Sequence, residues 1–175
     1  KLYQVDEPGG YESDVSNSGE FYTSDGPDTA IRGYDSNGNL LFDRNNEMQG
    51  DVDVVDLYYS EINDEVISLE SNDTSTLIVS YDSTTGSVNY KYSTDDTPYY
   101  GSINEDDNGN LVLAYSDYLD ASDNYVAKAY DFDSNSITQK YSVNDGDIRD
   151  IKVTETGSFV YANVDTDKTK YLDSS

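Results

Sequence analysis

The chain has 175 residues, of which 36 are acidic and 10 are basic, and its formal net charge is −26. It contains no His, Cys or Trp. This excludes His- or Cys-ligated zinc, thiol catalysis, disulfide bonds and a Ser-His-Asp triad. The charge also excludes sequence-independent binding to nucleic acid, because contacts to phosphates need clustered Lys and Arg. The length predicts one domain.

The acidic excess indicates a high-salt habitat. The acidic residues are 27 Asp and 9 Glu, and at moderate salt their mutual repulsion would weaken the compact state. At about 1 M salt the Debye length falls to about 3 Å and this repulsion is screened. We therefore predict a protein of a halophilic organism or of its virus. The alternatives are an acidic secreted protein or a disordered chain, although 18 Tyr and 4 Phe do not fit disorder.

Hydropathy predicts no membrane span, and the acidic composition is compatible with an extracellular location. No run of about 18 apolar residues is present, so membrane insertion is not expected. No signal peptide is visible, and the chain starts at Lys1 rather than Met. We expect a processed chain or part of a longer protein, on the surface of a cell or virion.

In chain order, the predicted elements are all short strands. Thr, Tyr, Val and Ile are frequent in them, and no segment of helix length has a sustained 3.6-residue apolar period. The expected strands are 2–6, 29–32, 39–42, 52–60, 65–70, 76–79, 87–92, 99–104, 111–115, 125–128, 136–141, 148–154 and 159–164.

A short tag repeats between pairs of these strands. It reads Tyr-Asp-Ser at 34–36 and at 81–83, Tyr-Asp at 130–131, and more weakly Leu-Asp at 172–173. Four short strands per repeat of about 40 to 50 residues are typical of a β-propeller blade. The sequence therefore predicts an all-β fold, a β-propeller with four four-stranded blades.

The predicted blades cover about 11–46, 51–94, 98–143 and 147–173, the last completed by residues 1–7. Residues 1–10 match 137–146 in pattern and in a turn closed by Gly, so the segment 2–6 could serve as the outer strand of the last blade and close the ring. Closure would remove an exposed sheet edge. The alternative is that the chain is a segment of a larger propeller.

The repeats resemble a known group. The run Ile78-Val79-Ser80-Tyr81-Asp82, followed by Thr85-Gly86-Ser87-Val88, is similar to the pyrroloquinoline-quinone-like and tryptophan-aspartate-like propeller repeats, of haloarchaeal or haloarchaeal-virus type. The resemblance implies the architecture. The Trp usual in these repeats is absent, which speaks against a quinone enzyme, and Phe42, Tyr92 and Tyr141 are expected in its place. Similar repeats are found in surface and virion proteins of halophilic archaea, which is used here as an analogy.

Three acidic stretches could bind Ca²⁺. Asp131, Asp133 and Asn135 alternate so that their oxygens could converge on one hard cation. Similar spacing occurs at 35–43, and 105–108 is a third cluster. The alternative for each is a polar hairpin turn, in which Asp, Asn and Gly serve the backbone. No other cofactor is expected.

Tyrosine pairs suggest a binding face. Tyr99 and Tyr100 start the third blade, and Tyr118 and Leu119 lie in 116–124, which we expect to be a polar loop. In a propeller the loops before the first strand and after the second strand share one face, so these residues would lie together, near loops at 25–28 and 165–167. Tyr suits binding surfaces because it joins apolar area to a polar tip. The alternative is packing between blades.

These features predict a binding or structural module on the outside of a halophilic virus particle or cell, such as a virion tail or fibre component that mediates attachment or assembly. Its partner would be a protein or a surface glycan, and it could belong to a larger assembly. No catalytic residue is assigned, and we predict that the chain is not an enzyme. The alternatives are a carbohydrate-active lyase or hydrolase, and a scaffold subunit of a surface filament or protein complex.

Overall fold

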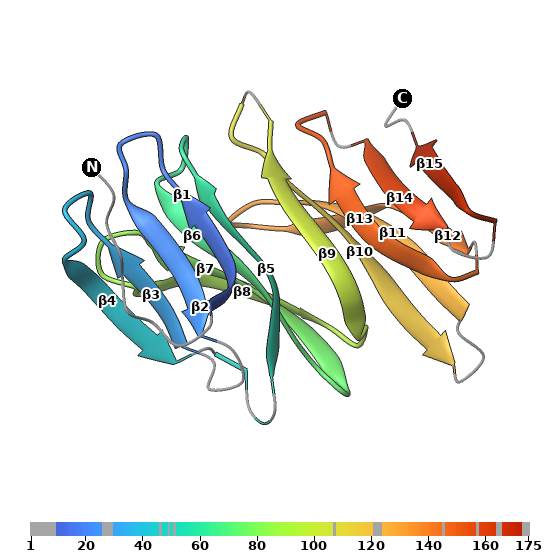
Figure 1. The fold of residues 1–175 in the computed structure, drawn as a ribbon, viewed down its shortest axis with the longest axis horizontal. Coiled ribbons are helices and arrows are strands. Elements are labelled where there is room, and N and C mark those ends of the chain that lie inside the picture. The colour runs from blue at the N-terminus through green and yellow to red at the C-terminus, as the bar shows by residue number, and fades with distance from the viewer. Residues whose placement is uncertain are drawn as a thin grey trace. The chain divides into compact units, whose positions relative to one another are not determined.

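The structure is a computed structural model in which fifteen strands and no helix are found among the described residues (Figure 1). In that part of the chain, no helix is long and apolar enough to cross a membrane. The described residues are 10–25, 30–45, 47–48, 50, 52–106, 108–120, 124–144, 146–156, 158–163 and 166–172.

The chain divides into two compact units, 1–94 and 95–175, and each is described by itself. The first unit holds two four-stranded sheets, in the orders β1-β2-β3-β4 and β5-β6-β7-β8. Their strands are β1 (Gly10–Val15), β2 (Phe21–Asp25), β3 (Ala30–Tyr34), β4 (Leu40–Asn45), β5 (Asp53–Ser60), β6 (Glu65–Asn72), β7 (Ser75–Asp82) and β8 (Val88–Thr94).

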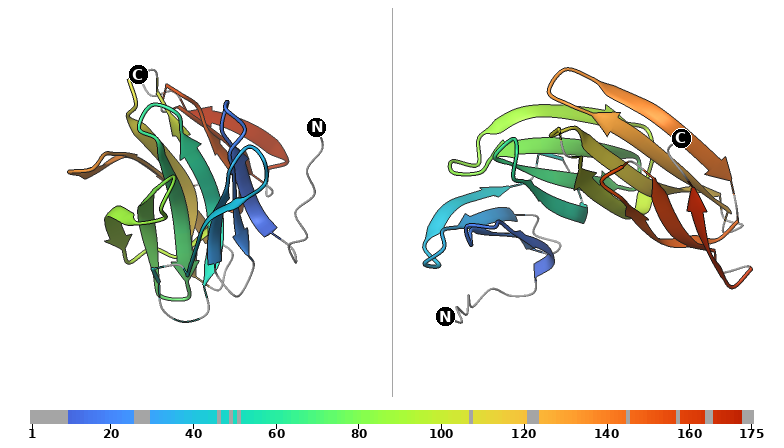
Figure 2. Two further views of the ribbon diagram at one scale, coloured as in Figure 1. Left: turned by 90° about the vertical axis from the view of Figure 1, so that its left-hand side faces the viewer. Right: turned by 90° about the horizontal axis from the view of Figure 1, so that it is seen from above.

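The second unit holds one four-stranded sheet, β9-β10-β11-β12, and one sheet of three described strands, β13-β14-β15. The smaller sheet lies against one face of the larger one (Figure 2). Their strands are β9 (Pro98–Glu105), β10 (Leu111–Asp120), β11 (Asn124–Phe132), β12 (Ile137–Asn144), β13 (Ile148–Val153), β14 (Phe159–Asn163) and β15 (Lys168–Leu172).

Strands adjacent in each sheet are adjacent in the chain and antiparallel. The prediction of an all-β fold built from four-stranded sheets is confirmed. The segment 2–6 lies outside the described residues, so its role as the outer strand beside β15 remains a prediction. The blade boundaries and the single domain also remain predictions.

In two of the sheets the second strand is the most deeply buried. In β6 every residue from Glu65 to Ser71 is buried, and in β10 every residue from Leu111 to Asp117 is buried. Because successive side chains of a strand point to opposite faces, both faces of these strands are covered. One core in each unit fills the space between its two sheets, around Tyr22, Val66 and Tyr81 in the first and around Ala127, Ile148 and Phe159 in the second.

The strand that follows the Tyr-Asp tag has the same shift of pairing register in three sheets. Gly33 pairs with Phe42 but Tyr34 pairs with Leu40, so β4 carries one extra residue, Leu41. The same shift makes Asn89 the extra residue of β8 and Lys140 that of β12. An extra residue of this kind is a β-bulge, which bends the strand and redirects side chains.

The register corrects one expectation. The residues that follow the extra residue are equivalent, and they are Phe42, Tyr90 and Tyr141. Tyr90, not Tyr92, therefore occupies the aromatic position of the second repeat, because the bulge adds a residue that strand periodicity alone does not count.

Buried carboxylates are held by hydroxyl groups. The fully buried side chain of Glu70 accepts hydrogen bonds from Ser68 Oγ and Tyr81 Oη, both at 2.8 Å, and from the backbone N–H groups of Glu47 and Met48 at 3.1 and 3.2 Å. Burial raises the pKa of Glu70, although these donors lower it in part. Glu70 thereby ties the segment between β4 and β5 to the core.

We predict that Glu70→Gln changes the pH dependence of stability. Glu70 has a raised pKa in the folded state, so its ionisation costs folding free energy as pH rises above the unfolded value of about 4.5. The wild type should therefore gain stability relative to Glu70→Gln as pH falls from neutral towards that value. Urea unfolding of both proteins at constant salt measures the difference.

Glu20→Gln is the control, because its effect on stability should change with pH in the opposite direction. Hydrogen bonds from Ser16 and Ser18 lower the pKa of Glu20, so its contribution is present above the unfolded pKa and is lost as pH falls through the folded pKa. A difference between wild type and Glu70→Gln that did not change with pH would contradict the assignment of Glu70.

Candidate functional site

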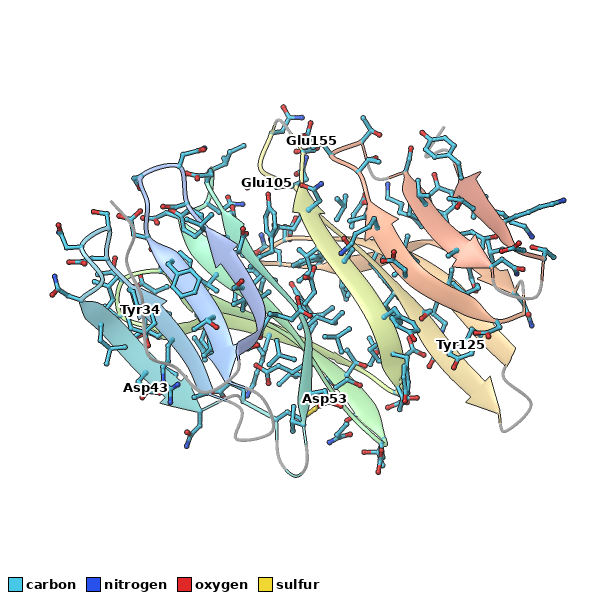
Figure 3. All side chains as sticks on the ribbon, viewed as in Figure 1. Tyr34, Asp43, Asp53, Glu105, Tyr125 and Glu155 are labelled. Atoms are coloured by element: carbon cyan, nitrogen blue, oxygen red, sulfur yellow. The ribbon has the colours of Figure 1, made fainter. Side chains whose placement is uncertain are left out.

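The second unit carries a polar groove of about 700 Å³. It lies where three turns meet: the turn between β9 and β10, the turn between β11 and β12, and the turn between β13 and β14. Glu105 and Glu155, which mark two of these turns, lie at the same end of the unit (Figure 3). The groove is lined by carboxylates, amides, hydroxyls and three larger apolar or aromatic side chains, Val112, Phe132 and Tyr141.

The first wall of the groove is a turn organised by Asp106. Its Oδ1 accepts hydrogen bonds from the backbone N–H groups of Asn108 (2.8 Å) and Asn110 (2.9 Å), and its Oδ2 accepts one from Asn110 Nδ2 (2.8 Å). Gly109 has a φ of 81°, which a side chain would disfavour. Hydrogen bonds from Asn110 and Asn108 hold the pKa of Asp106 below its ordinary value, so it is ionised at neutral pH.

The second wall is the turn after β11. Asp133 Oδ1 accepts hydrogen bonds from the backbone N–H groups of Asn135 (2.7 Å) and Ser136 (2.9 Å). In both walls an Asp carboxylate fixes the backbone in an Asx-type turn. The adjacent side chains are therefore presented on a defined rather than a variable backbone.

The β-bulge shapes the floor. Because Lys140 is an extra residue in β12, Lys140 and Tyr141 both line the groove although they are neighbours in sequence. The ring of Tyr141 packs on that of Phe159, with centroids 6.2 Å apart. One side of the Tyr141 side chain thus belongs to the core, and this contact fixes the ring in the groove.

The groove has a strong negative balance with one cation. Four carboxylates line it, those of Asp106, Asp131, Asp133 and Glu155, against the ammonium of Lys140. Lys140 Nζ lies 2.6 Å from Asp131 Oδ2, and this hydrogen bond raises the pKa of Lys140. The pair positions the ammonium within the groove.

The structure brings together two of the three stretches considered for Ca²⁺. Asp131, Asp133 and Asp106 line one groove, but Asp131 is paired with Lys140, and Asp133 and Asp106 accept hydrogen bonds from backbone N–H groups. Among the described residues no group of three or more acidic side chains is placed to hold a metal ion. Ca²⁺ binding by Asp131, Asp133 and Asn135 remains a prediction.

The predicted tyrosine face lies at the other end of the same sheet. Tyr100 pairs with Ser116, and Tyr118 pairs with Tyr125, while Tyr125 and Glu105 mark opposite ends of the unit (Figure 3). Tyr99 is 67% exposed because it is an extra residue in β9, between the pairs made by Pro98 and Tyr100. Tyr100 is partly buried against the core.

One part of that prediction is wrong. Tyr118 and Leu119 are strand residues of β10, which runs to Asp120, rather than residues of a polar loop over 116–124. Cross-strand pairing with β11 overrides the polar composition of the segment. The side chains of Tyr118 and Leu119, and residues 26–28 and 165 of the loops at 25–28 and 165–167, lie outside what the structure describes.

A second charged cluster lies on the face of the β9–β12 sheet opposite the core. Lys128 Nζ contacts Asp96 and lies 2.8 Å from Asp117 Oδ2, and Tyr115 donates its hydroxyl to Asp96. Burial alone would raise the pKa of Asp96, but the hydrogen bonds from Lys128 and Tyr115 outweigh it, and the net pKa is lowered. Burial alone would lower the pKa of Lys128, but Asp117 and Asp96 outweigh it, and the net pKa is raised. A lowered Asp pKa and a raised Lys pKa keep both groups charged and paired. Proton transfer near neutral pH needs the opposite shifts, which bring the pKa of a group towards the working pH.

No protein-family model matches the chain, and no curated protein matches its sequence. Solved structures with the same fold include Kuenenia stuttgartiensis hydrazine synthase (TM-score 0.68, 10% identity, 92% of this chain and 51% of that one). They also include virginiamycin B lyase from Staphylococcus aureus in a complex with quinupristin (0.61, 17%, 97% and 57%) and a nidogen/laminin complex (0.60, 12%, 93% and 59%). The extracellular domain of a putative one component system from B. thetaiotaomicron also matches (0.53, 13%, 86% and 20%).

These likenesses confirm the β-propeller architecture. The chain spans about half the length of the first of these proteins, 51% of it. Proteins of this fold include a lyase, a protein complex and an extracellular domain. At such low identities the likeness shows the fold alone.

The prediction that the chain is not an enzyme is contradicted. It rests on the absence of His and Cys and of any recognisable catalytic group, yet hydrazine synthase and virginiamycin B lyase have the same architecture. The fold therefore gives no ground for setting catalysis aside.

We predict that Lys128→Met lowers the unfolding free energy by about 3 kcal/mol, because it leaves two largely buried carboxylates without their cation. The side chains of Lys128 and Asp117 are only 17% and 9% exposed. Lys91→Met is the matched control: its pair with Glu47 is 51% and 29% exposed, and exposed pairs contribute less than about 1 kcal/mol. Chemical denaturation compares the two variants, and equal losses would contradict the burial argument.

Proposed function

We propose that the protein is a binding module on the outside of a halophilic cell or virus particle, with a virion tail or fibre as the favoured setting, and that it attaches through the turn-lined groove. The groove of about 700 Å³ is the observation that carries this proposal. Its size is that of typical ligand sites, which range from about 300 to 1,000 Å³.

The construction of the groove supports a binding role. Three turns meet there, and the backbones of two are fixed by Asp106 and Asp133. Polar side chains on such turns are held before a ligand arrives, so less conformational entropy is lost on binding. Tyr141 adds an anchored aromatic surface of the kind enriched at binding sites.

The opposite end of the β9–β12 sheet is less well suited to binding. Tyr99 is exposed, but Tyr100 packs against the core and is thereby partly used for stability. We therefore place attachment at the groove and keep the Tyr99 end as the alternative that the experiment distinguishes.

The setting is supported by composition and by fold. A net charge of −26 on 175 residues suits a medium in which salt screens repulsion. Extracellular domains and a protein–protein complex are among the structures with this architecture, which supports a partner-binding role outside the cell.

The test is adhesion of the fluorescently labelled chain to intact envelopes of a panel of halophilic archaea at about 1 M salt or above. We predict saturable binding to at least one envelope. Thr138→Arg, which fills the groove from the exposed side of β12, should weaken that binding at least about tenfold, equivalent to about 1.4 kcal/mol.

Two variants serve as controls. Thr169→Arg makes the same change on an exposed residue of β15 that does not line the groove and should bind as the wild type does. Tyr99→Ala should also bind normally. Absence of binding across the panel would contradict the proposed function, and loss on Tyr99→Ala but not on Thr138→Arg would move attachment to the other end of the sheet.

A further inference from the structure

We infer that the groove recognises a neutral glycan, that is, an uncharged ligand rich in hydroxyl groups. This inference rests on the proposed function and names the ligand class of the same site. Four features of the groove carry it: its charge, the commitment of its carboxylates, the anchoring of its aromatic ring, and the mixture of donors and acceptors on its walls.

The charge of the lining disfavours anionic ligands. Four carboxylates face one ammonium, and Asp106 has a pKa below its ordinary value, which keeps it ionised. The single ammonium, on Lys140, is already paired with Asp131 at 2.6 Å. A uronate, sulfate or phosphate group would therefore meet an excess of like charges, because the charge of the one ammonium is already balanced by Asp131.

The same carboxylates are already engaged by other groups of the protein. Asp106 and Asp133 accept hydrogen bonds from turn N–H groups, and Asp131 accepts from Lys140. Within the described part of the chain no three acidic groups converge as metal ligands would. At high salt, a lone ammonium on a ligand would also compete for these carboxylates with abundant monovalent cations. Recognition must therefore depend on short-range contacts.

The walls suit hydroxyl groups. Ser136, Thr138 and Thr156 supply hydroxyls, Asn108 and Asn110 supply amides, and four carboxylates belong to the same lining. Each sugar hydroxyl both donates and accepts a hydrogen bond, and this arrangement offers donors and acceptors side by side. Lys140 adds a donor: an ammonium has three N–H groups, and its bond to Asp131 uses one.

The floor suits a sugar ring. Tyr141 is held against Phe159, with ring centroids 6.2 Å apart, and packs on the core of the second unit. An aromatic ring fixed in this way presents an apolar face with little entropy left to lose. The C–H face of a hexose could lie on it while the ring hydroxyls reach the two walls. The bulge at Lys140 is what places the cation and the ring on the same side of β12.

Isothermal titration calorimetry of the full chain at about 1 M KCl tests the ligand class. The probes are neutral trisaccharides of gluco, galacto and manno configuration, with a uronate trisaccharide and a free-amine glucosamine trisaccharide for comparison. We expect saturable heat with at least one neutral probe and at least about tenfold weaker binding of both charged probes. Thr138→Arg should remove the heat, and Thr169→Arg should leave it unchanged.

The result separates the two proposals. Groove-dependent adhesion to envelopes together with no heat from any neutral probe, or with equal binding of the uronate, would overturn the glycan inference and leave the proposed function standing. Periodate oxidation of envelope sugars gives a second readout that does not depend on the choice of probe: we expect adhesion to fall at least tenfold after oxidation, and unchanged adhesion would overturn the glycan inference.

Discussion

Burial of acidic side chains without cations is the constraint on which the rest of this structure depends. The chain has 36 acidic and only 10 basic residues, yet strands such as β6 are covered on both faces, and Glu70 lies inside. Hydroxyl groups supply the missing donors: Tyr81 donates to Glu70 and Tyr90 donates to Glu65. A hydrogen bond acts at contact, so salt screening affects it far less than it affects attraction between exposed charges. At these positions Tyr provides both apolar area and a donor to a buried carboxylate.

The repeated bulge connects the fold to the candidate site. The extra residue stands at the same register in three sheets, but it is Leu41 in one, Asn89 in another and Lys140 in the third. The bulge is therefore common to the three sheets, whereas the side chain at the extra position differs. In β12, which lines the groove, that side chain is the ammonium-bearing Lys140. A site of this kind is added to a repeat without altering the packing that holds the repeat together.

Much of the fold could be predicted from the sequence because it is local. The Tyr-Asp tag, the Gly-containing turns and the alternation of strands gave the sheets and their order. The same reasoning noticed Asp106 and Asp133 as an acidic pattern, but it could not assign their oxygens, which are used by the N–H groups of their own turns. The groove escaped prediction because it depends on the meeting of two sheets and on one extra residue in β12. The polar composition around Tyr118 predicts a loop, and only cross-strand pairing shows that this residue belongs to a strand.

The most direct test of the account is amide hydrogen exchange of the full chain with and without saturating envelope glycan, resolved by peptide. If the groove is the binding site, exchange should slow in peptides covering 106–112 and 133–141, which carry two of its walls and its floor. Peptides covering 98–101 and 116–120, at the other end of the same sheet, should exchange as before. Slowing confined to those latter peptides, or to neither set, would contradict the account.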